Sequence, residues 1–165
     1  MSFAVAAEAY DRFMGRYSGP LTPLFADFAG VGAAQRVLDV GCGPGALTAE
    51  LIARLGGAAV TAVDPSESFA AAVHDRHPEI EVHSAPAEHL PFDGAVFDVC
   101  LAQLVVHFMA DPVAGLREMA RVTRPDGIVA ACVWDHGGGN GPLRAFRAAA
   151  HAARAGGVDA APLPG

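Results

Sequence analysis

Short apolar runs alternate along the chain with segments in which apolar residues recur every three or four positions. The runs predict five strands, at residues 36–40, 58–63, 80–84, 96–101 and 128–134. The helical spacing predicts helices between them, at residues 46–55, 66–77 and 112–123. Strands and helices in this alternating order are typical of a parallel sheet covered by helices on both faces, so we expect a doubly wound α/β fold.

Particular residues indicate where these helices begin and what they bury. Ser66 is a favourable N-cap for the second helix, and Asp111 with Pro112 combines a cap with a proline at the first helical position. The helix after Pro112 is expected to bury three side chains: Val113, Leu116 and Ala120. Residues 124–127, with the sequence RPDG, are expected to form a type I turn. The strand that follows is apolar throughout, as in a strand covered on both faces.

Two flanks lie outside this alternating core. Residues 1–30 are expected to form two short helices, broken at Gly19 and Pro20. Residues 31–140 form the predicted core, and residues 141–165 are expected to form one alanine-rich amphipathic helix and a tail rich in Gly, Pro and Ala.

Composition and charge narrow the class of protein. Of 165 residues, 52% are hydrophobic and 18% are charged, which fits one α/β domain with a substantial core. The net charge of −7 argues against nucleic acid as the main partner, and no apolar run is long enough for a membrane span. The beginning of the chain lacks the pattern of a signal peptide. The three cysteines show no spacing typical of disulfides, so we expect a cytoplasmic protein. The cysteines and histidines also lack the spacing of metal ligands, so we expect no bound metal.

The glycine-rich segment GCGPG, residues 41–45, lies between the first predicted strand and helix, where backbone can approach a ligand closely. Together with Ala46 and an acid about 20 residues later, Asp64, it also satisfies the loose dinucleotide fingerprint, so a nicotinamide cofactor stays an alternative. Asp39 favours a cationic ligand, because a carboxylate beside the loop would repel a pyrophosphate. Pro44 supports this, since it removes an N–H that a phosphate could use.

The same segment resembles the first motif of a known family. Residues 37–45, with the sequence VLDVGCGPG, resemble the D/E-x-G-x-G-x-G motif of class I S-adenosylmethionine-dependent methyltransferases. Residues 62–66 and 87–92 are similar to the second motif and to the segment that reaches the adenine, and residues 97–107 and 116–127 continue the series. The ordered set resembles the type 11 group, which includes ubiquinone and menaquinone biosynthesis enzymes. The resemblance implies strand order 3-2-1-4-5 and S-adenosylmethionine as the cofactor.

The resemblance also implies roles for residues at the ends of the strands. Asp39 is expected to face the methionine ammonium, Asp64 the ribose hydroxyls, and Glu88, with neighbouring backbone, the adenine. The expected contacts from the core are Asp39, Gly41, Gly43, Gly45, Asp64, Pro65, Ala87, Glu88 and Gln103. An ordinary turn residue at a strand end is the simpler alternative for Asp64.

In related enzymes the N-terminal flank folds over the cofactor. Here Tyr10 and Tyr17 could place aromatic faces over the sulfonium, and Arg16 could pair with the methionine carboxylate. A surface amphipathic helix is the alternative. His107 is the candidate catalytic residue, with a helix-start residue packed under the lid as the alternative. The acceptor is expected to be a small molecule, methylated by in-line displacement.

Family members usually continue into a sixth and seventh strand, and residues 135–165 are expected to lack such a pair. The alternative hypothesis is therefore a truncated cofactor-binding fragment without turnover.

The missing pair predicts self-association. The edge of the strand at residues 128–134 is expected to lack a partner and contains no charge or proline to block pairing, so a second copy could add to it. Light scattering coupled to size exclusion should detect oligomers. A monomer over a wide range of concentration would contradict the prediction.

Overall fold

The computed structural model describes residues 7–135, and the side chains from residue 15 onward. The helix and tail expected after residue 141 lie outside the described residues. The elements are α1 (Ala7–Phe28), β1 (Val37–Val40), α2 (Ala46–Leu55), η1 (Gly57–Ala59), β2 (Val60–Asp64), α3 (Glu67–Arg76), β3 (Glu81–Ser84), β4 (Phe97–Gln103), η2 (Val106–Phe108), α4 (Pro112–Val122) and β5 (Thr123–Cys132). All of them lie in one compact unit that ends at Val133. None of the described helices is long and apolar enough to cross a membrane.

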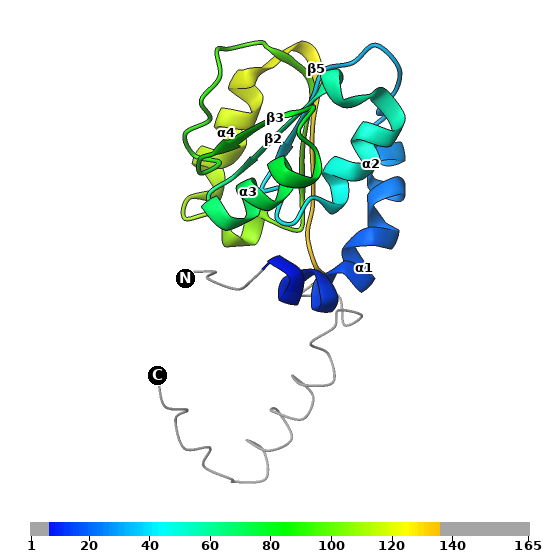
Figure 1. Ribbon diagram of the computed structural model, residues 1–165. Coiled ribbons are helices and arrows are strands. Elements are labelled where there is room, and N and C mark those ends of the chain that lie inside the picture. Colours follow the sequence, from blue (N-terminus) through cyan, green and yellow to red (C-terminus); the bar gives the residue numbers. More distant parts are fainter. Residues whose placement is uncertain (1–6, 136–165) are drawn as a thin grey trace, which may run out of the picture. The chain divides into compact units, whose positions relative to one another are not determined.

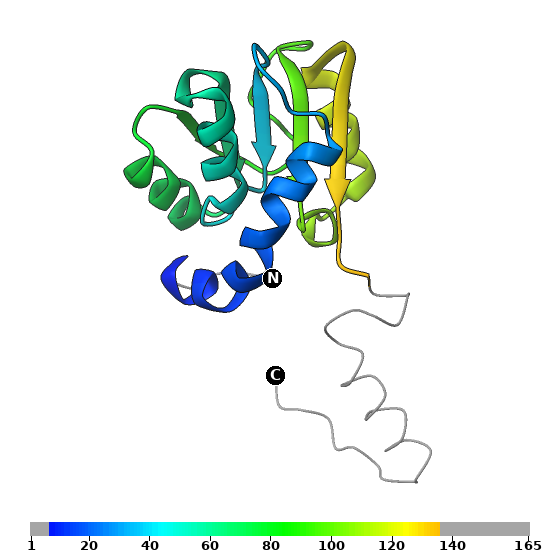
Figure 2. The same cartoon turned by 90° about the vertical axis from the view of Figure 1, so that its right-hand side faces the viewer.

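The strands form one parallel sheet in the order β3-β2-β1-β4-β5, as predicted. Figure 2 shows β1, β4 and β5 running in the same direction, and β2 and β3 pair parallel to them, so the carboxyl ends of the strands meet at one edge. β2 begins at residue 60 instead of 58, because residues 57–59 form the 3-10 turn η1. β4 continues to Gln103, beyond the expected end at residue 101.

Helices cover both faces of this sheet, which confirms the doubly wound fold (Figure 1). On one face, side chains of α1, α2 and α3 pack against Val99 and Leu101 of β4. On the other face, Met119 and Val122 of α4 pack with Cys100 of the same strand. Successive residues of β4 thus enter opposite cores, which is why the central strands read as continuous apolar runs.

The break expected in the N-terminal flank is absent, and α1 continues through Pro20 and Pro23. A proline cannot donate to the carbonyl four residues earlier, and for Pro23 that carbonyl belongs to Gly19. The Thr22 hydroxyl donates to it instead, at 2.9 Å. Arg54 of α2 binds the carbonyl of Pro23 at 3.1 Å and so ties the later turns to the core. Figure 2 shows the early turns of α1 at an angle to the later ones.

α4 begins as predicted but buries a different face. The Asp111 carboxylate accepts from two amides of the first turn, both at 3.0 Å, as an N-cap should. Val113 and Leu116 are 56% and 38% exposed, however, and Ala120 is also exposed. The buried residues are Gly115, Met119 and Val122. Both sets have helical spacing, so periodicity alone could not choose between them.

Three smaller expectations were wrong wholly or in part. Ser66 occupies the N-cap position of α3, but its hydroxyl pairs with the Ser68 hydroxyl instead of a backbone amide. Residues 124–127 form an irregular start to β5, and Asp126 has φ +65°, which excludes a type I turn. β5 is not covered on both faces, since Ile128 and Val129 are 39% and 38% exposed. A strand at the edge of the described sheet lacks the neighbours of a central one.

Candidate functional site

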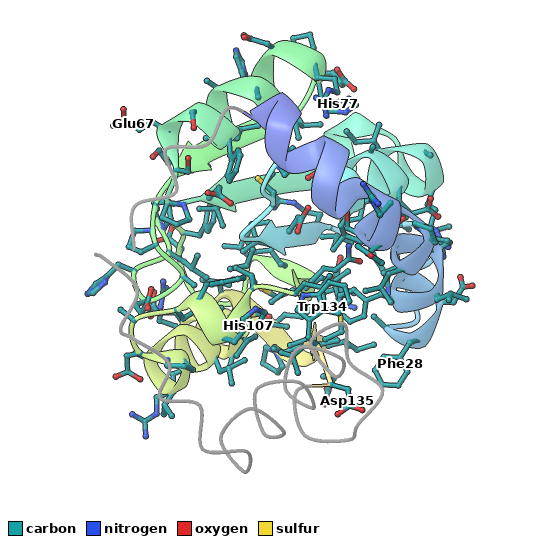
Figure 3. All side chains as sticks on the ribbon, turned by 90° about the horizontal axis from the view of Figure 1, so that it is seen from below. Phe28, Glu67, His77, His107, Trp134 and Asp135 are labelled. Atoms are coloured by element: carbon teal, nitrogen blue, oxygen red, sulfur yellow. The ribbon has the colours of Figure 1, made fainter. Side chains whose placement is uncertain are left out.

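A pocket of about 810 Å³ lies at the carboxyl edge of the sheet. Its walls come from residues 41–44, 46–47, 64–69, 86–88, 103–105 and 107–110, at or after the ends of β1, β2, β3 and β4, and from Asp39 and Ser18. Figure 3 looks onto this edge, with Glu67 and His107 among the labelled side chains. The pocket lies where the chain order reverses between β1 and β4, the usual position of ligand sites in open parallel sheets.

Backbone hydrogen bonds hold the glycine-rich loop after β1 against the end of β2. The amides of Gly41 and Cys42 donate to the Val63 carbonyl of β2, at 2.7 and 3.1 Å. Gly41 has φ +70°, and a Cβ atom there would lie 2.4 Å from Cγ2 of Val105. Gly43 also has a positive φ, but a Cβ atom there would meet nothing within 4 Å. Gly41 is therefore required by packing, whereas Gly43 keeps space open inside the pocket.

Asp64 lies at the end of β2 and binds both adjoining loops. One carboxylate oxygen accepts from the Gly43 amide and the other from the Ser66 amide, each at 2.8 Å. Burial raises the pKa of this carboxyl, and the two amide bonds partly offset that rise. Asp64 is thus a turn-forming residue in the pocket wall, and each oxygen keeps a further lone pair for a ligand hydroxyl.

Asp39 is 1% exposed at the base of the loop. Burial raises its pKa to about 7, with a smaller contribution from the Asp64 charge. The Thr48 hydroxyl of α2 donates to Oδ2 of Asp39 at 2.6 Å and acts in the opposite direction. Thr48 was not predicted from the sequence. The feature that could have identified it is a polar residue on the apolar face of α2, next to Leu47.

The segment after β3 is fixed to α4. Oε1 of Glu88 accepts from the Asp111 amide at 3.0 Å, which leaves its other oxygen available to the pocket. Arg121 donates to two backbone carbonyls of residues 90–92, at 2.8 and 3.0 Å. Glu118 binds Arg121 at 2.6 Å and accepts an amide bond from the same segment at 3.0 Å. These two residues of α4 were not expected to support the site, and no local motif marks them.

Residues 104–110 form an apolar wall that the sequence did not predict as a unit. Leu104 has φ +59°, and its amide donates to the Cys132 carbonyl at 2.9 Å. This conformation turns the chain from β4 into η2. His107 and Phe108 lie in η2 with their ring centroids 4.0 Å apart. His107 is exposed and belongs to the pocket lining.

The structure gathers most of the expected residues in this one pocket. The lining includes Asp39, Gly41, Gly43, Asp64, Pro65, Ala87, Glu88, Gln103 and His107. Gly45 is not in the lining and instead lies against Val73 of α3, where a Cβ atom would be 3.0 Å from a methyl group.

The N-terminal flank reaches the pocket through a residue that was not predicted. The α1 residue in the lining is Ser18, whose carbonyl accepts a long bond from Gln103 Nε2 at 3.4 Å. Arg16 and Tyr17 are exposed and outside the lining. The side chain of Tyr10 lies outside the described ones. A lid role for these three residues therefore stays a prediction.

The pocket lining is acidic. Among the residues that the structure describes, it contains four carboxylates and no lysine or arginine: Asp39, Asp64, Glu67 and Glu88. Carboxylates in a partly enclosed pocket favour a ligand with positive charge and disfavour phosphates.

Comparison with known proteins agrees with this geometry. A family described as a methyltransferase domain matches residues 38–131. An uncharacterized methyltransferase of Mycobacterium tuberculosis is 37% identical over 135 residues, covering 82% of this chain and 52% of that protein. A malonyl-[acyl-carrier protein] O-methyltransferase of Erwinia billingiae is 35% identical over 130 residues, covering 78% and 50%. The chain thus spans about half the length of these curated relatives.

Solved structures share the fold. The structure of a SAM-dependent methyltransferase from Aquifex aeolicus has a TM-score of 0.69 at 18% identity, covering 96% of this chain and 91% of that one. Identity this low supports the likeness of fold alone.

The two loop glycines should respond differently to alanine. Gly41→Ala places a methyl group against Val105 and should lower the free energy of unfolding by about 2–4 kcal/mol, from overpacking and left-handed strain together. Gly43→Ala carries the strain alone and should cost about 1–2 kcal/mol. Urea unfolding of both variants measures the difference. Adding Val105→Ala should restore part of the loss in the Gly41 variant only, and equal losses in the two single variants would contradict the packing argument.

Proposed function

Because the chain belongs to the class I S-adenosylmethionine-dependent methyltransferases, in the type 11 group, we propose that its pocket binds S-adenosylmethionine and that it methylates a small-molecule acceptor. The observation that carries the proposal is the acidic lining around the glycine-rich loop. This ligand bears a sulfonium and an ammonium, and both are attracted by carboxylates. A dinucleotide would instead bring its pyrophosphate toward Asp39.

The residues present fit this cofactor. Asp39 offers its second oxygen to the ammonium end, since Oδ2 is occupied by Thr48. Asp64 retains acceptor capacity for the ribose hydroxyls. The open space over Gly43 lets a ligand lie against the loop backbone. Ala87 and Glu88 would contact the adenine from the segment anchored to α4.

The sulfonium supplies a good leaving group when the cofactor is bound, so the protein mainly aligns the reactants and excludes water. Water would be excluded by the apolar wall, which contains Leu104, Val105, Phe108 and Met109. His107, exposed at this wall, is the candidate general base for an acceptor that must lose a proton. Transfer of label from S-adenosylmethionine to components of a cell extract would identify the acceptor.

Self-association through β5 also remains a prediction. β5 lies at the edge of the described sheet, and the exposed Ile128 and Val129 support an accessible strand.

Calorimetric titration should distinguish the cofactors. S-adenosylmethionine and S-adenosylhomocysteine should bind, because the lining is acidic and the loop is open over Gly43. NAD should not bind, because Asp39 and Asp64 oppose its phosphates. Heat from NAD and none from either sulfur ligand would overturn the proposal.

Asp64 variants should separate ligand binding from loop support. Asp64→Ala should lose about 2–4 kcal/mol of cofactor binding free energy, since charge-assisted bonds to the ribose are removed. Because the carboxylate also holds Gly43 and Ser66, this variant should lose about 1–3 kcal/mol of unfolding free energy as well.

Asp64→Asn is the matched control. It keeps one acceptor oxygen for a loop amide, so it should retain more stability while binding still weakens. Calorimetry and urea unfolding of the two variants measure both quantities. Unchanged affinity in folded Asp64→Ala would mean that Asp64 supports the loop only.

A further inference from the structure

Thr48 is fully buried in α2 and directs its hydroxyl at Asp39. The donor–acceptor distance is 2.6 Å, and the partner is Oδ2 of a carboxyl group that is itself 1% exposed. A hydroxyl has a single proton, so this bond occupies Oδ2 of Asp39, and the Thr48 backbone amide also lowers the pKa of the same carboxyl group. Asp39 also belongs to the pocket lining, whereas Thr48 does not.

The geometry of α2 supports this use of the hydroxyl. A threonine inside a helix often donates to the carbonyl four residues earlier, which here belongs to Pro44. That carbonyl accepts from Nη1 of Arg76 in α3 at 2.6 Å. The Thr48 proton goes to the carboxyl group instead.

We propose that Thr48 is a positioning residue for the cofactor site: it fixes one oxygen of Asp39, and binding of the cofactor's cationic end at the other oxygen releases the Asp39 proton to solvent. The inference rests on the proposed function, because it requires S-adenosylmethionine in this pocket. The proton balance is simple. The protonated carboxyl and the cationic ligand give a carboxylate–cation pair and one free proton.

The surroundings of Asp39 favour this coupling. Its strand neighbours in register are Ala62 of β2 and Leu101 of β4, which are apolar and buried. The titratable groups that interact with it are Asp64 and the buried thiols of Cys42 and Cys100. Burial raises the pKa of Cys42 well above its usual range and the pKa of Cys100 to about 12. No lysine or arginine of the described lining offsets these groups.

The sign of the pH dependence follows from these contacts. Because the pKa of Asp39 is about 7, a cation must compete with a proton below that pH. Affinity should therefore rise with pH and level off once the carboxyl is ionised, with about a tenfold gain between pH 6 and pH 8. The Thr48 bond lowers the pKa, so its loss should move the midpoint upward.

The experiment is calorimetric titration with S-adenosylmethionine from pH 6 to 8.5, in two buffers that differ in ionisation enthalpy. The wild-type chain should release protons on binding near neutral pH. Thr48→Val removes the donor with little change of volume. This variant should shift the midpoint of the pH dependence upward and weaken binding of S-adenosylmethionine at pH 7 several-fold. At the highest pH its affinity should approach that of the wild type. Thr48→Ser keeps the donor and should restore the wild-type profile.

Two further variants make the result specific. Asp39→Asn removes the titrating carboxyl group, so the pH dependence that remains reports the ligand's own amino group. The protein itself should release no proton when this variant binds the ligand. Thr123→Val removes another buried hydroxyl, bonded at 2.7 Å to the Met119 carbonyl away from the pocket, and should leave the profile unchanged. Circular dichroism and thermal unfolding confirm that each variant is folded.

The possible failures are distinguishable. No binding of S-adenosylmethionine at any pH would sink the proposed function. Binding without proton release, a Thr48→Val profile equal to the wild type, or an equal shift in Thr123→Val would overturn this inference alone.

Discussion

A buried carboxyl group beneath the glycine-rich loop is the constraint on which the rest of the site depends. Asp39 lies in a central strand with apolar neighbours on both sides, where an unpaired negative charge is costly. The protein provides one neutral hydroxyl donor, from Thr48, and places a second carboxylate nearby at Asp64. Near neutral pH the group is therefore poised between its protonated and charged forms, and a cationic ligand would stabilise the charged one.

The loops around this carboxyl are held by hydrogen bonds to their backbone amides and carbonyls. Asp64 binds an amide on either side of itself, and the Val63 carbonyl accepts from two amides of the glycine-rich loop. On the far side of the sheet, Arg121 and Glu118 hold the segment after β3 through its carbonyls and an amide. The pocket is thus assembled from segments that are individually irregular but anchored to regular elements, which preorganises it for a ligand.

Several elements show which features could be predicted from the local sequence pattern and which could not. The five strands and their order follow from apolar runs and from the family motifs, and both are confirmed. The break at Gly19 and Pro20 was wrong: α1 continues through Pro20 and Pro23, and at Pro23 the Thr22 hydroxyl satisfies the carbonyl that the proline leaves free. The buried face of α4 was wrong as well, because two sets of residues share helical spacing and only contact with the sheet selects one.

The amino-acid sequence by itself determined the alternation of strands and helices, the glycine-rich loop and the carboxylates beside it. These features depend on residues close together in the chain, where period, turn chemistry and charge act locally. Only the tertiary structure decided that Gly41 faces Val105, that Thr48 binds Asp39, and that residues 104–110 form one wall of the pocket. Those relations depend on which segments meet when parallel strands align their carboxyl ends, and no spacing along the chain specifies the contacts made there.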